Sequence, residues 1–366
     1  MKKKAYIVFL SLISVFPAVM LISFSLEAAR SAGELIGPKL QKIFPFSEAA
    51  IYNYQANAAA VAVPAAEDSE DNADFLPEPP PKLEETVLLF VGDIMLGRGV
   101  EKSVEKNGGE FSFLFENAEF IKAADITFGN LEGPISDKGS DRRNLYSFRF
   151  KPETASALKA AGFDALSLAN NHTGDWGREA FEDTVSRLTA QNIPPVGGGI
   201  NEEEASSPKV IEINGLKIGF LGFSDVGPDW LAANEDSSGI LIVDNGFKEK
   251  IKEASRSVDV LITSFHFGDE YQKNPNQRQK NLARAAIDNG AKIVVGHHPH
   301  VVQGTEEYNG GFIAYSLGNF IFDQNFSEDT MRGAALEVKL SEDGEIKSAE
   351  MKNIKINQFF QPELAQ

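Results

Sequence analysis

Six short apolar runs after residue 85 alternate with helical patterns, and each run ends in a cluster of polar residues. The runs cover 87–91, 125–128, 165–169, 259–264, 292–295 and 311–316. Helical patterns lie between them at 152–162, 178–191 and 277–290. Such an alternation predicts an α/β fold with a mainly parallel sheet and helical cover. Further along the chain, Asp343-Gly344 predicts the turn of a β-hairpin.

The polar residues at the ends of these runs are candidates for a single site. They are Asp93, Glu132, Asn171, His172, His266, His297, His298, His300 and Asn319. In open α/β sheets the ligand site lies beyond the carboxyl ends of the strands, so these side chains are expected to converge. The chain has five histidines, and all of them are in this set. Because imidazole is the commonest metal ligand, the set indicates a metal centre.

Taken singly, several of these residues also have a structural explanation. Asp93 follows Gly92 at a strand-to-turn junction, where aspartate is common. Glu132 could be a solvated loop acid, and Asn171 could cap a following helix. A lone histidine at a strand end, such as His266, is more often structural than a ligand. The convergence of every histidine on strand ends favours the site over these separate explanations.

The residue types favour a transition-metal ion. Neutral imidazoles combined with carboxylates and an amide oxygen suit Zn²⁺, Mn²⁺ or Fe rather than Ca²⁺. One or two divalent ions are expected. Two ions about 3.5–4 Å apart would lower the pKa of a bridging water and clamp a phosphoryl group. An imidazole outside the metal shell could protonate the leaving oxygen.

Composition and missing motifs exclude several other classes of protein. The chain has no cysteine, which excludes disulfides and thiolate metal sites. Its 53 acidic against 35 basic residues give a net charge of −18, which argues against broad nucleic-acid binding. The sequence contains neither the GxxxxGK[ST] pattern of an ATP-binding loop nor the GxSxG pattern of a serine hydrolase.

The N-terminal region is expected to be a membrane anchor. Three lysines precede the uncharged stretch 5–26. As a helix this stretch would measure roughly 33 Å, enough for a hydrocarbon core of about 30 Å. A cleaved signal peptide is the alternative, although its apolar part is usually about 7–15 residues. We therefore expect an anchor or signal at 1–26, an Ala-, Pro- and acid-rich linker at 27–85, and a folded domain at 86–366. The lysines place that domain outside the cytoplasm, on a single-pass cell-membrane protein.

Seven ordered stretches of the chain resemble the CapA family, which is linked to poly-γ-glutamate capsule synthesis. They are GDIMLGR (92–98), GNLEGPIS (129–136), SLANNHTGDWG (167–177), GGGIN (197–201), HFGDEY (266–271), GHHPHVVQG (296–304) and YSLGNFIFD (315–323). The domain of that family is similar to the calcineurin-like metallophosphoesterases. The resemblance covers roughly residues 86–340 and implies a four-layer α/β/β/α sandwich behind a membrane anchor.

The resemblance also implies roles for single residues. Asp93 matches the first metal-binding aspartate, and it is a catalytic candidate together with His172. In the Asn-His pair, Asn171 binds metal and His172 lies beside the leaving group. His266 matches the lone histidine ligand of a later strand end.

The last histidine stretch and two departures complete the implied site. His298 and His300 match the closing His-x-His, and His297 stays open as an alternative first member. GNLE replaces the usual GDxxD, so Glu132 is our assignment for the bridging carboxylate. Met95 stands where the wider superfamily has a metal-binding histidine.

Two functions follow from this reading. The first is a membrane-anchored, metal-dependent hydrolase of phosphoester type that acts in surface-polymer biosynthesis. The second is a non-catalytic subunit that uses the same cleft to bind or export the polymer. The expected partners are the membrane, a surface polymer or phosphoester substrate, and other capsule-synthesis membrane proteins, with no nucleic acid.

Overall fold

A computed structural model describes residues 85–365 of the chain. The expected anchor at 1–26 lies outside these residues, and so does the expected linker except for Glu85. Within the described part, no helix is both long and apolar enough to cross a bilayer.

The first sheet has eight strands and contains the start of the folded domain. Its strand order is β16-β15-β14-β1-β2-β3-β4, with β13 paired to β1 as well. The strands are β1 Thr86–Ile94, β2 Ile126–Leu131, β3 Ala165–Ser167, β4 Pro195–Val196, β13 Asn319–Ile321, β14 Arg332–Leu340, β15 Ile346–Ile356 and β16 Pro362–Leu364. Strands β1 to β4 are parallel, whereas β14 to β16 are antiparallel. The predicted hairpin is confirmed as β14–β15, with Gly344 in the left-handed region at φ 77°.

The second sheet has six strands in the order β11-β12-β10-β9-β7-β6. They are β6 Lys209–Ile213, β7 Leu216–Ser224, β9 Val260–His266, β10 Ile293–His297, β11 Thr305–Tyr308 and β12 Gly311–Ala314. The four inner strands are parallel, and β6 and β11 join the two edges as antiparallel strands. The six predicted runs are therefore all strands, but they are divided between two sheets. A separate two-stranded sheet pairs β5 Gly198–Gly199 with β8 Gly239–Ile240.

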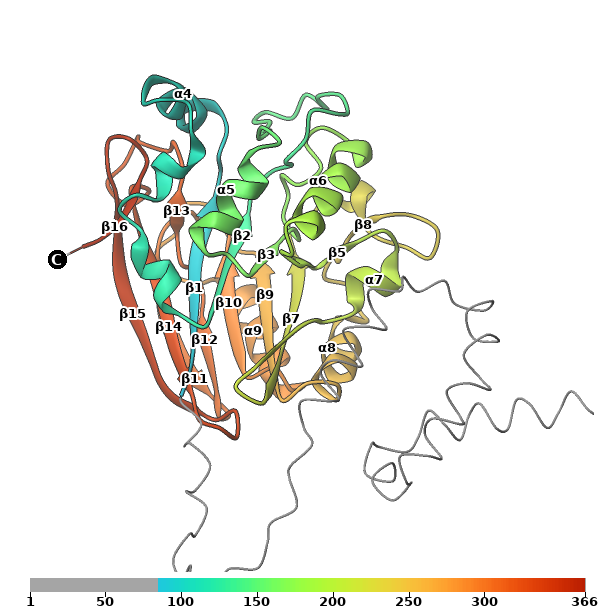
Figure 1. Ribbon diagram of the computed structural model, residues 1–366. Coiled ribbons are helices and arrows are strands. Elements are labelled where there is room, and N and C mark those ends of the chain that lie inside the picture. Colours follow the sequence, from blue (N-terminus) through green and yellow to red (C-terminus); the bar gives the residue numbers. More distant parts are fainter. Residues whose placement is uncertain (1–84, 366) are drawn as a thin grey trace, which may run out of the picture. The chain divides into compact units, whose positions relative to one another are not determined.

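Helices cover the outer faces of the two sheets (Figure 1). They are α4 Arg98–Lys106, α5 Thr154–Ala161, α6 Arg178–Ala190, α7 Glu202–Ser206, α8 Phe247–Ser255 and α9 Gln277–Asp288, with short 3-10 helices at Phe111–Phe115, Glu119–Ala123 and Asp229–Leu231. The start of α9 is fixed by a capping box between Asn276 and Gln279. All three predicted helices are present.

Three apolar cores define the layers. One lies between the first sheet and α4 to α6, and another lies between the second sheet and α8 and α9. The third lies between the two sheets, where Phe128 of β2 stacks on Phe220 of β7 with ring centroids 5.4 Å apart. The described part of the chain is therefore a mixed α/β fold, as predicted, with two facing sheets between two layers of helices.

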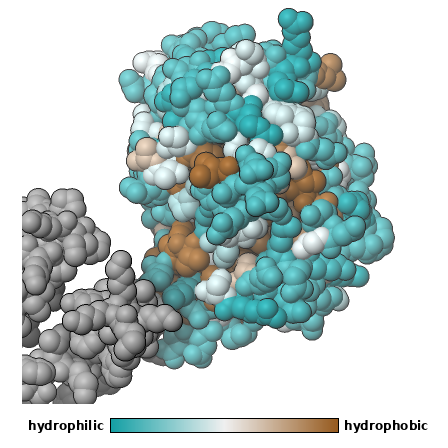
Figure 2. All heavy atoms as spheres, turned by 90° about the vertical axis from the view of Figure 1, so that its right-hand side faces the viewer, coloured by the Kyte–Doolittle hydropathy of each residue, from teal (hydrophilic) through white to brown (hydrophobic). Residues whose placement is uncertain are grey.

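The surface near α7 and α8 is mostly hydrophilic, and its apolar patches are separate from one another (Figure 2). A shallow pocket on the acidic α7–α8 side is lined by five glutamates and a single lysine. The lining of this pocket is therefore net negative.

Candidate metal centre

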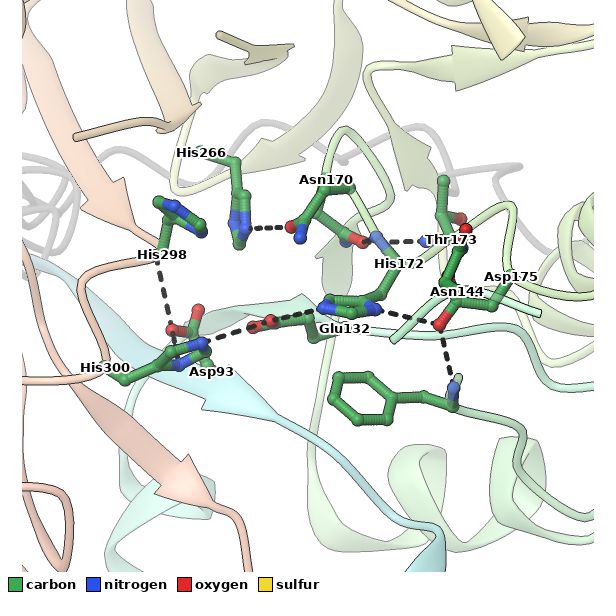
Figure 3. Close-up of polar contacts among 12 residues, drawn as sticks. Asp93, Glu132, Asn144, Asn170, His172, Thr173, Asp175, His266, His298 and His300 are labelled. Carbon is green, nitrogen blue, oxygen red and sulfur yellow. Dashed lines mark hydrogen bonds and ion pairs between the residues drawn. The ribbon is translucent and has the colours of Figure 1, made fainter. Parts of the chain in front are cut away.

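The carboxyl ends of β1, β2, β9 and β10 meet where the two sheets face each other (Figure 3). Asp93 near the end of β1 pairs in register with Asn130 of β2 and with Asn319 of β13. His266 at the end of β9 pairs with His297 at the end of β10. The two sheets thus bring residues more than 170 positions apart in the sequence to one buried place.

Asp93 lies at the centre of this cluster and is fully buried. Its Oδ1 accepts a hydrogen bond from Asn130 Nδ2 at 2.9 Å and lies 3.3 Å from His297 Nδ1. Its Oδ2 lies 3.2 Å from His300 Nδ1. Burial alone would raise the pKa of Asp93, but the close approach of His297 and His300 outweighs burial and holds that pKa well below its usual value. Asp93 is therefore an anion inside the fold.

Glu132 is also fully buried, and its Oε1 has no hydrogen-bond partner. That oxygen lies 3.5 Å from His300 Nε2. Burial raises the pKa of Glu132 well above its usual value, against the opposing charge of His300. Asp93, Glu132 and His300 offer ligand atoms that all lie within 4.8 Å of one another. A buried carboxylate oxygen without a partner is costly unless a cation neutralises it, so this donor set fits a divalent metal ion.

A second donor set is formed by His266, Asn171 and His298. The Nε2 atom of His266 lies 2.8 Å from Asn171 Oδ1, and the His266 and His298 rings are 4.8 Å apart. Burial, reinforced by neighbouring histidines, lowers the pKa of His298 to about 4 and that of His266 well below its usual value. Both rings are therefore neutral near pH 7, as metal binding requires. The Nδ1 atom of His298 is buried without a hydrogen-bond partner.

The backbone of the last histidine stretch is strained. His298 and His300 have φ values of 96° and 57°, in the left-handed region that non-glycine residues rarely adopt. Each such conformation costs roughly 1–3 kcal/mol and is concentrated at functional sites. The bend between them is held in part by the amide of Tyr271, which donates to the Pro299 carbonyl at 2.8 Å. These strained conformations therefore lower the stability of the fold, and they orient the two imidazoles toward the cluster.

His172 lies at the edge of the cluster and is fixed by neighbours of its own. Its Nδ1 atom lies 2.8 Å from Asp175 Oδ2, and its ring packs on Phe148 with centroids 4.0 Å apart. The amide of Phe148 donates to the same Asp175 oxygen at 2.7 Å. The free Nε2 atom then faces Glu132 Oε1 at 4.0 Å. The arrangement suits a residue that exchanges a proton beside a metal centre.

Two asparagines that the sequence analysis did not single out connect these parts. Asn130 Nδ2 reaches Asp93, Glu132 Oε2 at 3.4 Å and His266 Nδ1 at 3.4 Å. Asn170 Nδ2 donates to Asn130 Oδ1 at 3.0 Å. Asn130 could have been found in the sequence, because it follows an apolar run just as Asp93 does. The connecting role of Asn170 depends on contacts between strands and carries no local signal.

The structure also locates one further acid, Glu270, and the two residues whose roles the sequence left open, His297 and Met95. Glu270, four residues after His266, forms a second possible metal-binding group with His298 and His300. His297 does not belong to either metal-binding group found among the described residues, which favours His298 as the first member of the closing pair. Met95 is fully buried in the apolar core, where its Sδ accepts from the Gly97 amide at 3.2 Å.

Comparison with known proteins places this cluster in a family. The family model described as "Bacterial capsule synthesis protein PGA_cap" matches residues 87–324. This range contains every residue of the cluster. The chain belongs to the PGA_cap family. The predicted resemblance to CapA is thereby confirmed.

Curated relatives of this PGA_cap protein have capsule-related names. The chain is 39% identical over 259 residues to "PGA biosynthesis protein CapA" of Bacillus subtilis, covering 70% of this chain and 68% of that protein. It is 35% identical over 271 residues to "Capsule biosynthesis protein CapA" of Bacillus anthracis, covering 71% and 65%. The chain thus spans about two thirds of the length of each. Among solved structures, the Haemophilus influenzae NAD nucleotidase matches with a TM-score of 0.44 and 13% identity, over 77% of this chain and 54% of that chain.

We predict that added divalent metal stabilises this PGA_cap domain more strongly as pH rises from about 6.5 to about 9. Burial opposes protonation of His300, but Glu132 and Asp93 outweigh it and raise the pKa of His300 from 6.5 to about 9. In the metal-free fold the proton on His300 contributes stability below pH 6.5, and this contribution is lost as pH rises to about 9. A metal must displace the same proton to bind.

Thermal unfolding with and without added Mn²⁺, measured across this pH range, checks the prediction. The gain in melting temperature on adding Mn²⁺ should increase with pH. A gain that stays flat or shrinks from pH 6.5 to 9 would contradict the assignment of His300 as a ligand.

Proposed function

We propose that this PGA_cap domain is a divalent-metal-dependent hydrolase of phosphoester type that acts in the production of a capsule polymer. The observation that carries the proposal is the buried group of Asp93, Glu132 and His300, whose ligand atoms lie within 4.8 Å of one another. His172 stands beside this group and is oriented by Asp175. The four-layer order of helices and sheets also agrees with a metallophosphoesterase type of fold.

The metal would be held by two donor sets. Asp93, Glu132 and His300 form the first, and Asn171, His266 and His298 form the second. Their mixture of imidazole, carboxylate and amide oxygen suits one or two ions of Mn, Zn or Fe. When bound, such ions polarise a phosphoryl oxygen and lower the pKa of a coordinated water.

The protein side chains would position the substrate and move the proton. Asp175 accepts from Nδ1 of His172, which leaves Nε2 pointing into the site. A protonated Nε2 can donate to the leaving oxygen as the phosphoester bond breaks. Phe148 packs against the imidazole and limits its rotation. His172 would thus act as general acid, while Asp93 keeps the neighbouring imidazoles in place.

A polymer-binding or export subunit is the second candidate function. It is favoured by the names of the curated relatives, which refer to biosynthesis and not to hydrolysis. In this case the same cleft would bind anionic groups of the polymer through its metal without breaking a bond. Turnover separates the two functions, because a metal would lie in the cleft in both.

A substrate screen tests the proposal. The purified protein is stripped with EDTA, reloaded with Mn²⁺, Zn²⁺ or Fe²⁺, and assayed on phosphomonoesters and phosphodiesters. We expect hydrolysis only after reloading, and a loss of at least about 100-fold in the His298→Ala variant. Normal metal content without turnover of any ester would favour the binding subunit instead.

We also propose that residues 1–26 anchor the protein in the cell membrane with the domain outside. The support is the uncharged stretch 5–26 behind three lysines. Protease added to intact protoplasts should then remove the domain from the cell surface. Protection of the domain, or its release into the medium as a form starting after Leu26, would contradict the anchor.

A further inference from the structure

A cavity of about 490 Å³ lies against β14 and β15, and its lining carries positive charge. Three cations line it, Lys273, Arg332 and Lys355, against the single carboxylate of Asp329. Such a concentration of cations is unexpected in a chain of net charge −18. It also contrasts with the pocket of five glutamates on the side of α7 and α8.

Two of these cations face each other directly. Arg332 of β14 and Lys355 of β15 are partners in the antiparallel register, and both are exposed. Side chains opposite each other in such a pair have Cβ atoms about 4.5–5.5 Å apart, and like charges there are destabilising. The nearest acid of Arg332 is Glu328 at 3.3 Å, which is 88% exposed and therefore gives little compensation. Glu363 of β16 is the register partner of Lys355 on the other side of β15, but no acid lies within 4.0 Å of the Lys355 ammonium group among residues 85–365. An anionic ligand would relieve this repulsion.

The third cation reaches the cavity from a different segment. Lys273 lies in the loop after β9 and forms an ion pair with Asp329 at 2.7 Å. The exposed side chain of Asn353, which precedes Lys355 by two residues on β15, also lines the cavity and brings amide donors. The lining thus combines cations from three segments with a neutral hydrogen-bond donor.

The cavity adjoins the candidate metal centre along the chain. Val301 and Val302, which directly follow His300, form part of its wall. Lys273 is three residues beyond Glu270, which can hold a metal together with His298 and His300. Three residues span at most about 11 Å even when fully extended. Glu270 and Lys273 are therefore close enough for one extended ligand to contact both.

We propose that this cavity binds a carboxylate of an extended polycarboxylate substrate whose reacting group lies at the metal centre. The proposal rests on the proposed function, since it extends the substrate of that site. Carboxylate is favoured over phosphate because the lining residues lie on strands and loops, without the helix N-terminus that phosphate sites commonly use.

The test measures the binding of a fluorescein-labelled poly-γ-glutamate oligomer to the full chain. Binding is detected by fluorescence anisotropy in the presence of EDTA. The double variant Arg332→Gln/Lys355→Gln should raise Kd about tenfold. The matched control is Lys339→Gln/Lys347→Gln, which removes two cations from the same two strands, with Lys339 about 23 Å from Arg332. We expect this control to bind as the wild type does. Without polymer the first variant should keep or raise the melting temperature, because a repulsion is removed.

Equal Kd values for the wild type and Arg332→Gln/Lys355→Gln would overturn the proposal. Weakened binding of inorganic polyphosphate together with unchanged binding of the glutamate oligomer would overturn its carboxylate assignment. Because EDTA removes the metal, these outcomes do not depend on hydrolysis. If the wild type hydrolyses small esters but the wild type and Arg332→Gln/Lys355→Gln bind the oligomer equally, only the carboxylate-binding cavity is ruled out. If the tenfold change in Kd is found but no ester is hydrolysed, only the hydrolase function is ruled out.

Discussion

Replacing His172 by alanine should slow phosphoester turnover by about 10²- to 10⁴-fold while bound metal stays at the wild-type level. The expectation follows from the position of its ring, which is held by Asp175 at 2.8 Å and points Nε2 at Glu132. Turnover at saturating substrate, measured together with elemental analysis of the same sample, checks the prediction.

The variant Asp175→Asn is the companion measurement. It keeps the shape of the side chain but removes the charge that orients His172, so we expect a smaller loss of turnover and an altered pH profile of kcat. Loss of metal in parallel with activity in His172→Ala would show that His172 is a ligand. That result would contradict its role as proton donor.

Replacing Asp93 by asparagine should remove metal from the first donor set and destabilise even the metal-free protein. Asp93 is buried among His297, His300 and Asn130, and its loss leaves the charge of His300 with one partner fewer. Breaking a buried ion pair from one side typically costs about 3–5 kcal/mol. Urea unfolding in EDTA at pH 7 measures this free energy, and metal analysis measures the occupancy.

A surface carboxylate provides the control for Asp93→Asn. Asp137 pairs with Arg187 at 2.9 Å but is 64% exposed, so Asp137→Asn should cost at most about 1 kcal/mol. The pKa of Asp93 is held low, so its stabilising effect is present near neutral pH and is lost as pH falls through that pKa. The difference between the wild type and Asp93→Asn should therefore shrink in acid. Equal stability of the two proteins at pH 7 would contradict the buried ion pair.

The elements and the location of the site could be predicted from the sequence because both depend on local patterns. Apolar runs of strand length ended in polar residues, and the rule that sites lie beyond parallel strand ends then grouped Asp93, His266 and His300. The division of the strands between two sheets could not be predicted from these runs alone. Strand pairing joins distant segments, as β1 with β13 and β14 shows. The resemblance to CapA was needed to suggest it.

The finer geometry of the site could not be predicted from the sequence either. Nothing local separates His297 from His298, yet only the latter joins a metal-binding group, and its φ of 96° turns it toward the cluster. The role of Asn130 as a bridge between Asp93 and His266 depends on strands of both sheets lying side by side. Such contacts are decided by tertiary packing rather than by residue type or spacing.

The most direct test of the metal centre is anomalous diffraction from crystals of the metal-loaded protein, recorded at the absorption edges of Mn, Fe and Zn. We expect one or two peaks within coordination distance of the donor sets Asp93, Glu132, His300 and Asn171, His266, His298. The peak beside Asp93 should vanish in Asp93→Asn. Crystals grown with excess metal that give no peak at either set, or a peak elsewhere only, would show that these residues do not form a metal centre.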